Sequence, residues 1–308
     1  MSILDVNNLL KVYPGKQSTP AVDGISFQLL EHEILGLVGP NGSGKTTTIQ
    51  ILLGTLSPTA GSIRYFGKDF AVYRSEILQN ISFASTYASL PWNLSLAENL
   101  EIFGLIYGLD RQKSHRKFDP LLERFGIADK KHKPVSDLSA GQVTRLLLVK
   151  AFFIEPKIVL LDEPTASLDP DIASEICTFL LEQRDKQGVS VLFTSHKMQE
   201  VMEICDRTIF LKNGKIIAND LPKTLARSAS KFQVVLVIVD GLKRTMEIVK
   251  AAGLECKQDH RTLEIAMDEE KIPPFLDALS KSEVVYASIK INEPSLDDYF
   301  FEITKKKP

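Results

Sequence analysis

The sequence is poor in the residues that build metal or disulfide frameworks, and it has little excess charge. It holds three cysteines, one tryptophan and five histidines in 308 residues, with a formal net charge of −2. Cys177, Cys205 and Cys256 form no CxxC pair, so we interpret them as reduced packing residues rather than zinc or redox ligands. The basic stretch 111–117 is interpreted as a solvated face, and nucleic acid is not expected as a partner.

A long apolar run is also missing. The apolar run near the C-terminal end, residues 234–239, is far shorter than the roughly 20 residues needed to cross a bilayer. Residues 1–10 lack the positive cluster and apolar core of a signal peptide. We therefore expect a chain that stays in the cytoplasm and has any membrane role only through a partner.

What is present is the composition of a folded protein. Hydrophobic residues make up 44% and charged residues 25%, and the length suits one large domain with a smaller one. Buried strands and helices alternate in the first part, which predicts a mostly parallel sheet covered on both faces. The expected strands are 3–6, 25–29, 34–38, 61–66, 158–161 and 189–193, and the expected helices are 45–53, 142–153 and 171–187. A helical insertion is expected over 95–126, and a hairpin turn at 212–215.

The polar stretch 222–231, rich in serine and alanine, predicts a domain boundary. We expect one domain over residues 1–222, a linker over 223–231 and a small α+β domain over 232–308. The second domain reads strand, helix, two strands, helix and strand, which is the order of a split βαβ unit. A capped helix is expected over 295–303.

A phosphate-binding loop follows the strand that ends at Val38. The segment 39–47 fits the pattern GxxxxGK[ST] and lies between a buried strand and a helix, where backbone N–H groups and the helix dipole can hold a phosphate. Lys45 is expected to reach the β- and γ-phosphates, and the Thr46 hydroxyl to bind Mg²⁺. The expected nucleotide-binding residues here are Gly39, Pro40, Asn41, Gly42, Ser43, Gly44, Lys45, Thr46 and Thr47.

Two carboxylates end the buried strand 158–161. Asp162 is expected to hold Mg²⁺, and Glu163 to polarise the water that attacks the γ-phosphate. Ligands bind at this end of the strands in open α/β sheets. Together with the phosphate loop, these acids indicate a P-loop NTPase, a class that also includes kinases and GTPases.

The segment 138–142, Leu-Ser-Ala-Gly-Gln, resembles the LSGGQ signature of ABC ATPases. It precedes a helix and lies upstream of Asp162, while 162–169 resembles the second acidic motif running into the D-loop, and His196 follows the next strand. The resemblance covers about residues 1–220. It implies a RecA-like parallel sheet core with an antiparallel β subdomain and a helical subdomain, followed here by the small α+β domain.

The resemblance also implies roles for single residues. Tyr13 occupies the place of the aromatic that stacks on adenine, and His196 that of the histidine that senses the γ-phosphate. In the family, two cassettes dimerise head to tail, so Ser139 and Gly141 would contact ATP held by the partner. The other nucleotide contacts implied are Gln142 and Asp169. Three places depart from the pattern: Thr86 stands where glutamine is usual, Ala140 replaces a glycine, and Glu31 and His32 stand where a Pro-Gly turn is common.

The C-terminal segment 293–300 resembles ATPase subunits of bacterial multidrug, polysaccharide or lipid exporters. This implies a homodimer or heterodimer of cassettes that uses ATP and Mg²⁺ to drive an integral membrane permease, from the cytoplasmic side of the membrane. Residues 90–107 would receive the permease. Two alternatives remain, a soluble ABC ATPase with a regulatory role and a P-loop small-molecule kinase.

Overall fold

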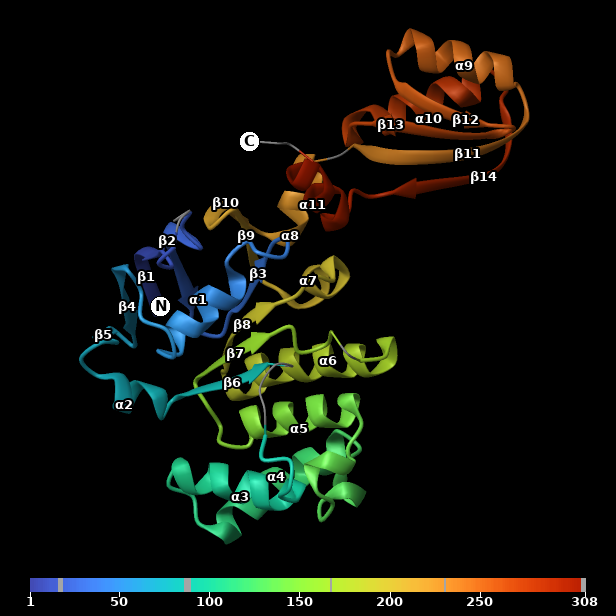
Figure 1. The fold of residues 1–308 in the computed structure, drawn as a ribbon. Helices are drawn as coiled ribbons and strands as arrows, with labels where there is room; N and C mark the ends of the chain where they lie inside the picture. The colour runs from blue at the N-terminus through green and yellow to red at the C-terminus, as the bar shows by residue number, and fades with distance from the viewer. Residues whose placement is uncertain (16–18, 86–89, 167, 230, 306–308) are drawn as a thin grey trace. The chain divides into compact units, whose positions relative to one another are not determined.

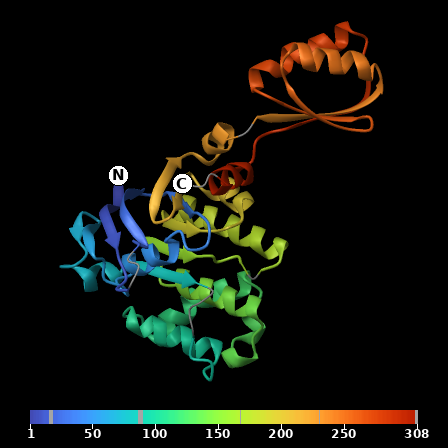
Figure 2. The same ribbon diagram turned by 45° about the horizontal axis from the view of Figure 1, so that its top comes forward.

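The computed structural model describes residues 1–15, 19–85, 90–166, 168–229 and 231–305. The chain divides into two compact units, Met1–Pro222 and Lys223–Pro308 (Figures 1 and 2). None of the described helices is both long enough and apolar enough to span a bilayer.

The core of the first unit is a six-stranded sheet in the order β10-β9-β3-β8-β7-β6. Its strands are β3 Ile34–Val38, β6 Ile81–Ser85, β7 Ile158–Asp162, β8 Ser190–Thr194, β9 Arg207–Lys212 and β10 Lys215–Asp220. All neighbours pair in parallel except the β9–β10 hairpin. Every residue of β3, β7 and β8 is buried, as their continuous apolar runs predicted. The helices α1 Lys45–Leu52, α5 Ala140–Phe152 and α6 Pro170–Gln187 were expected, whereas helix α7 Met198–Ile204 was not.

An antiparallel sheet in the order β2-β1-β4-β5 forms the second part of this unit. Its strands are β1 Ser2–Lys11, β2 Val22–Leu30, β4 Ala60–Tyr65 and β5 Lys68–Asp69, followed by the short helix α2 Arg74–Leu78. Strand β1 is longer than the expected 3–6. The expected strand ended too early because the alternation of side chains is broken at an irregularity, where Asn8 adopts a left-handed φ of 46°. Apolar residues of this sheet and of β3 share one core.

A helical lobe is built from α3 Leu96–Ile106 and α4 Arg111–Arg124, which lie beside α5 and away from the antiparallel sheet (Figures 1 and 2). Helix α3 begins with a capping box between Ser95 and Glu98, and Asp110 caps α4. The lobe is the helical insertion predicted from the sequence. With these parts, the expected fold of a P-loop core, an antiparallel β subdomain and a helical subdomain is confirmed.

Most of the expected linker over 223–231 forms helix α8, Pro222–Ala229, at the point where the chain divides into its two units. Leu225 and Ala226 are buried, although the stretch is polar on average. Proline is tolerated at the first helical position, where its missing N–H would have no intrahelical partner. A composition average cannot show that two apolar side chains fall on one helical face.

The second unit contains one four-stranded antiparallel sheet in the order β12-β13-β11-β14. Its elements are β11 Phe232–Asp240, α9 Leu242–Ala251, β12 Glu255–Asp259, β13 Thr262–Met267, α10 Ile272–Lys281, β14 Val285–Asn292 and α11 Leu296–Lys305. Helices α9 and α10 lie on one face of the sheet (Figure 1). The alternating burial of β11 supplies Val234, Leu236 and Ile238 to a core separate from that of the first unit. The element order is that of a split βαβ unit.

Candidate active site

Three glycines shape the loop between β3 and α1. Gly39, Gly42 and Gly44 have φ values of 154°, 78° and 107°, conformations that favour glycine. A Cβ atom at Gly39 would lie 2.2 Å from the carbonyl oxygen of Leu211, and one at Gly44 would lie 2.4 Å from that of Ala21. The loop therefore packs against backbone from two other segments so closely that no side chain fits at these two positions.

Lys45 lies across this loop. Its Nζ donates hydrogen bonds to the carbonyl oxygens of Gly39 at 2.7 Å and Pro40 at 3.3 Å, and the residue is buried. Burial lowers the pKa of Lys45, while the nearby carboxylates of Glu163 and Asp162 act in the opposite direction. A buried ammonium group held over backbone carbonyls is well placed to exchange them for anionic phosphate oxygens.

The loop forms one wall of a cavity of about 590 Å³. The residues that line it are Ala21, Asn41, Gly42, Ser43, Gly44, Lys45, Thr46, Thr47, Glu163 and His196. Gly39 and Pro40 contribute to the loop through their bonds to Lys45. The structure thus brings the phosphate loop, the expected base and the expected histidine to one cavity, although they are far apart in the sequence.

A pair of oxygen ligands suited to Mg²⁺ lies beside this cavity. The Thr46 hydroxyl is 3.3 Å from Oδ2 of Asp162, whose Oδ1 accepts a hydrogen bond from the Thr194 hydroxyl at 2.8 Å. Mg²⁺ in nucleotide sites takes one or two protein oxygens together with phosphate oxygens and water. The donor set of Thr46 and Asp162 fits this requirement.

Glu163 and His196 face each other. Oε2 of Glu163 lies 3.4 Å from Nδ1 of His196. Glu163 has a φ of 51°, an uncommon conformation for a residue with a side chain, and its N–H donates to the Thr194 hydroxyl at 2.9 Å. Such local strain tends to gather at functional sites, where surrounding bonds hold it in place.

The residues of the signature segment 138–142 lie at the start of α5 and not in the cavity. The Ser139 hydroxyl accepts from the N–H of Gln142 at 3.3 Å, and the Gln142 side chain accepts from the N–H of Ser139 at 2.9 Å, so the two form a capping box at the start of α5. A Cβ at Gly141 would lie 3.5 Å from the Leu168 side chain. Asp169 is exposed and begins α6 without a capping bond from its side chain. These residues do not line the cavity of their own chain.

Two further expectations concern Tyr13 and Thr86. Tyr13 is 46% exposed with Nζ of Lys11 at 5.3 Å from its ring centre, and it is not among the described residues that line the cavity. Thr86 lies outside the described residues.

Thr194 is a further residue of the site that was not predicted from the sequence. It lies opposite Asp162 in the parallel register of β8 and β7, and its hydroxyl contacts both Asp162 and Glu163. Its only signal was a polar residue at the end of a buried strand, one place before Ser195. The register that joins the two strands is a property of the sheet and cannot be read from spacing along the chain.

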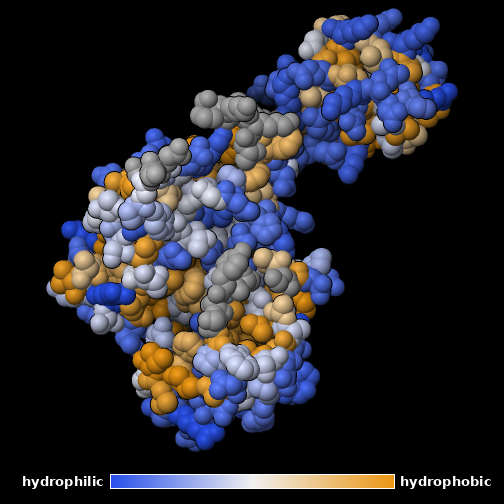
Figure 3. Space-filling view, viewed as in Figure 1, coloured by the Kyte–Doolittle hydropathy of each residue, from blue (hydrophilic) through white to orange (hydrophobic). Residues whose placement is uncertain are grey.

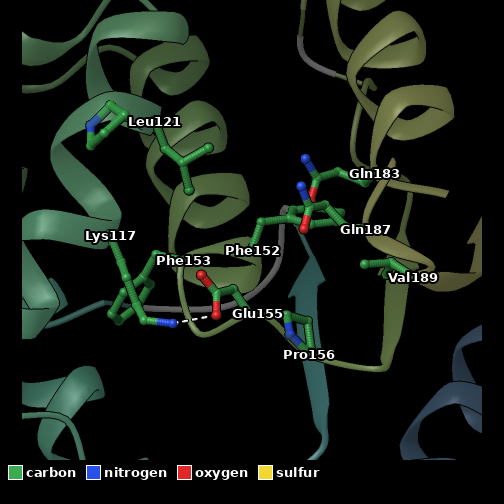
Figure 4. Close-up of a pocket in the computed structure, with 10 residues that line it drawn as sticks. Lys117, Leu121, Phe152, Phe153, Glu155, Pro156, Gln183, Gln187 and Val189 are labelled. Atoms are coloured by element: carbon green, nitrogen blue, oxygen red, sulfur yellow. Dashed lines mark ion pairs between the residues drawn. The ribbon is translucent and has the colours of Figure 1, made fainter. Parts of the chain in front are cut away.

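A smaller cavity of about 250 Å³ lies between α4, the end of α5 and the end of α6 (Figure 4). Phe152 and Phe153 line it, and an ion pair joins Lys117 to Glu155 at its side. None of the described motif residues lines it, so the larger cavity is the candidate active site.

Comparison with known proteins places these features in a family. A family model described as ABC transporter matches residues 22–166. The Nod factor export ATP-binding protein I of Burkholderia lata is 34% identical over 225 residues, which are 73% of each chain. The doxorubicin resistance ATP-binding protein DrrA of Mycobacterium tuberculosis is 30% identical over 97% of this chain and 92% of its own.

Solved structures with a similar fold belong to the same family. A structure of the ATP binding subunit of an ABC transporter has a TM-score of 0.68 at 27% identity, over 74% of this chain and 93% of that one. The cbiO1 protein of Clostridium perfringens, part of the ABC transporter complex cbiONQ, has a TM-score of 0.63 at 30% identity, over 73% and 90%. From the motifs, the fold and these relatives, the chain belongs to the family of ABC transporter ATP-binding proteins, which hydrolyse ATP to power transport.

Proposed function

We propose that this chain is the ATPase subunit of an exporter, in which two cassettes close over ATP and drive a membrane permease. The observation that carries the proposal is the single cavity that gathers the phosphate loop, Glu163 and His196. Relatives named for Nod factor export and doxorubicin resistance support the exporter role. The chain would act at the cytoplasmic face of the membrane as a peripheral subunit.

The phosphate loop would hold the triphosphate. Lys45 would exchange its bonds to the loop carbonyls for β- and γ-phosphate oxygens, and the inward N–H groups of the loop would bind the remaining charge. Thr46 and Asp162 would hold Mg²⁺, which neutralises developing charge on the phosphates when bound. Thr194 keeps the Asp162 carboxylate turned toward Thr46 through its bond to the other carboxylate oxygen.

Glu163 would orient and polarise the attacking water. Its side chain is largely shielded, and its backbone is fixed by the bond to Thr194. His196 is more exposed than Glu163 and lines the same cavity, where it would contact the γ-phosphate. In this arrangement a largely shielded carboxylate would act on the water, and a more exposed imidazole would contact the phosphate.

The second half-site would come from a second cassette. Ser139, Gly141 and Gln142 begin α5, whose free N–H groups and positive dipole end suit a phosphate, yet they do not line the cavity of their own chain. A partner cassette in head-to-tail contact would bring them, and Asp169, to the nucleotide. Either a second copy or a related chain would satisfy this arrangement.

The permease would dock on the helical lobe. Helix α3 exposes Ile102, Leu105 and Ile106, with exposed fractions of 43%, 65% and 60%, and Trp92 just before the helix is 71% exposed. Figure 3 shows apolar residues gathered over α3. Clustered exposed apolar side chains commonly mark a protein interface, and these lie within the segment 90–107 expected to receive the permease.

The substitution Glu163→Gln tests this function in the full chain. Because the amide keeps the shape but cannot act as a base, we expect ATP turnover to fall at least about 100-fold while ATP binding persists and the ATP-bound dimer lives longer. Turnover is followed by phosphate release, and dimerisation by size-exclusion chromatography with ATP. The control is Glu203→Gln, an exposed acid on α7. Normal hydrolysis by Glu163→Gln would contradict the assignment of the base.

A further inference from the structure

A second carboxylate, Glu200, lies behind the site in the first turn of α7. It is 7% exposed, and its Oε2 accepts hydrogen bonds from the hydroxyls of Thr165 at 2.6 Å and Ser195 at 3.0 Å. Both of these residues are also buried. Since a buried carboxylate is costly unless its oxygens find donors, these bonds hold all three side chains in fixed positions.

Lys197 closes the same cluster. Its Nζ lies 3.2 Å from Oε1 of Glu200 and donates to the carbonyl oxygen of Thr165 at 2.9 Å. Its backbone N–H donates to the Ser195 hydroxyl at 3.0 Å. The contact with Oε1 is an ion pair without hydrogen-bond geometry, so the two hydroxyls remain the directional partners of Glu200.

The cluster joins the two segments that carry the expected catalytic groups. Thr165 lies two residues after Glu163, and Ser195 immediately precedes His196. We propose that Glu200 is a positioning residue for ATP hydrolysis, because its carboxylate holds these two segments at the separation that brings Glu163 and His196 to 3.4 Å. The inference rests on the roles proposed above for Glu163 and His196.

The bonds of Thr194 and Glu200 hold the segment that carries Glu163 at two points. Glu163 is in a strained conformation, and its N–H is held by Thr194 on one side of the segment. The Thr165 bond to Glu200 holds the other side, two residues further on. A strained residue keeps its conformation only while the bonds around it persist. Loss of the bond between Thr165 and Glu200 would therefore let the carboxylate of Glu163 move away from the attacking water. A shift of about 1 Å in a reacting group can cost roughly 100-fold in rate.

The test compares Glu200→Ala and Glu200→Gln with Glu203→Gln in the full chain. Glu203 lies on the same helix but is exposed, so its variant should hydrolyse ATP as the unaltered chain does. We expect Glu200→Ala to lower kcat at least about tenfold with the KM for ATP changed less than about twofold, because the phosphate loop is not touched. Glu200→Gln should recover part of kcat, since the amide can still bond to both hydroxyls.

Thr165→Val supplies a second approach that removes one bond and leaves the carboxylate in place. Its kcat should also fall, and the pair Thr165→Val with Glu200→Ala should be no slower than Glu200→Ala alone, since both changes break the same link. Should Glu200→Ala give little folded protein, Thr165→Val and Glu200→Gln carry the test by themselves.

Three outcomes separate the proposals. In the first outcome, Glu163→Gln is inactive, but Glu200→Ala, or Thr165→Val in its place, has the same kcat as Glu203→Gln. This overturns the positioning role of Glu200, and the assignment of Glu163 as the base stands. If Glu163→Gln hydrolyses ATP normally, the proposed function fails first. A rise in KM equal to the fall in kcat/KM, with kcat unchanged, would show that Glu200 supports nucleotide binding and would also overturn the positioning role.

Discussion

At the scale of single residues, the phosphate loop owes its conformation to backbone that comes from distant parts of the chain. Gly39 faces Leu211 and Gly44 faces Ala21, each at a distance that excludes a Cβ atom. The motif predicted the glycines because of what they offer a phosphate. The structure adds a second reason, which is the close approach of neighbouring backbone.

The substitution Gly39→Ala should therefore destabilise the protein and abolish ATP binding. A Cβ atom 2.2 Å from the Leu211 oxygen forces the loop or β9 to move, and we expect the free energy of unfolding to fall by about 3 kcal/mol. Chemical denaturation and titration with ATP measure the two effects. In the control Gly67→Ala, the glycine also has positive φ but has open space around it, so only about 1 kcal/mol and no binding should be lost.

Residues whose spacing fits a motif could be predicted from the sequence, whereas residues brought to the site by strand pairing or helix packing could not. The phosphate loop, Asp162, Glu163 and His196 were all predicted. Residues 41–47 of the loop, Glu163 and His196 line one cavity, and Asp162 is bonded to Thr46. Thr194 and Glu200 were not predicted. Their contacts arise from the pairing of β7 with β8 and from the packing of α7, and neither leaves a periodic or motif-like trace in the sequence.

At the scale of helices and strands, burial decided how well the sequence could be interpreted. The bounds of β3 were predicted to the residue, and β7 and β8 nearly so, since a strand covered on both faces is apolar throughout and is flanked by polar residues. The bulged end of β1 and the helix α8 were missed. In both, polar side chains interrupt the pattern while a few apolar ones are buried by tertiary contacts.

The start of α5 offers a test of the second half-site. Serine, asparagine and aspartate are comparably good helix caps, so Ser139→Asn and Ser139→Asp should both leave the melting temperature nearly unchanged. If Ser139 faces the phosphates of a partner's ATP, the negative charge of aspartate alone should lower hydrolysis at least about tenfold. Equal hydrolysis by the two variants would show that Ser139 serves only as a cap in its own chain.

The contact between α3 and α5 predicts a pH dependence. Lys150 of α5 places its Nζ 4.5 Å from the ring centre of Phe103 on α3, and in the described part of the chain it has no ion-pair partner. Burial lowers the pKa of Lys150 to about 8, whereas an unfolded lysine has a pKa of about 10.4. Between these values the unfolded chain binds more protons than the folded one, so stability should rise with pH in this window.

The variant Lys150→Met should remove both the charge of Lys150 and the rise of stability with pH in this window. We expect it to be more stable than the unaltered chain at pH 7, by up to about 3 kcal/mol, and the difference to shrink between pH 8 and pH 10. Urea denaturation at each pH measures this. Lys186→Met, at a lysine whose side chain is 69% exposed, should match the unaltered chain at every pH. A constant difference between Lys150→Met and the unaltered chain would contradict the lowered pKa.

At the scale of the whole molecule, the two units have separate hydrophobic cores. We expect calorimetry to show two transitions, because each core can unfold with its own cooperativity. Leu4→Ala in the first core and Leu236→Ala in the second should each lower the temperature of one transition and leave that of the other unchanged. Each should lower the free energy of unfolding of its own unit by about 2 to 5 kcal/mol. ATP should raise the temperature of only that transition whose temperature Leu4→Ala lowers. A single transition displaced by both variants would mean that the units unfold together.

The hairpin between β9 and β10 links the beginning of the first unit to its end. Gly214 donates its N–H to the carbonyl oxygen of Ser43 in the phosphate loop and accepts from the N–H of Asp23. A nascent chain on the ribosome therefore possesses the whole loop motif early in synthesis but lacks its support until the hairpin has emerged. Nucleotide capture during translation should begin only then, after the last hairpin of the first unit has formed.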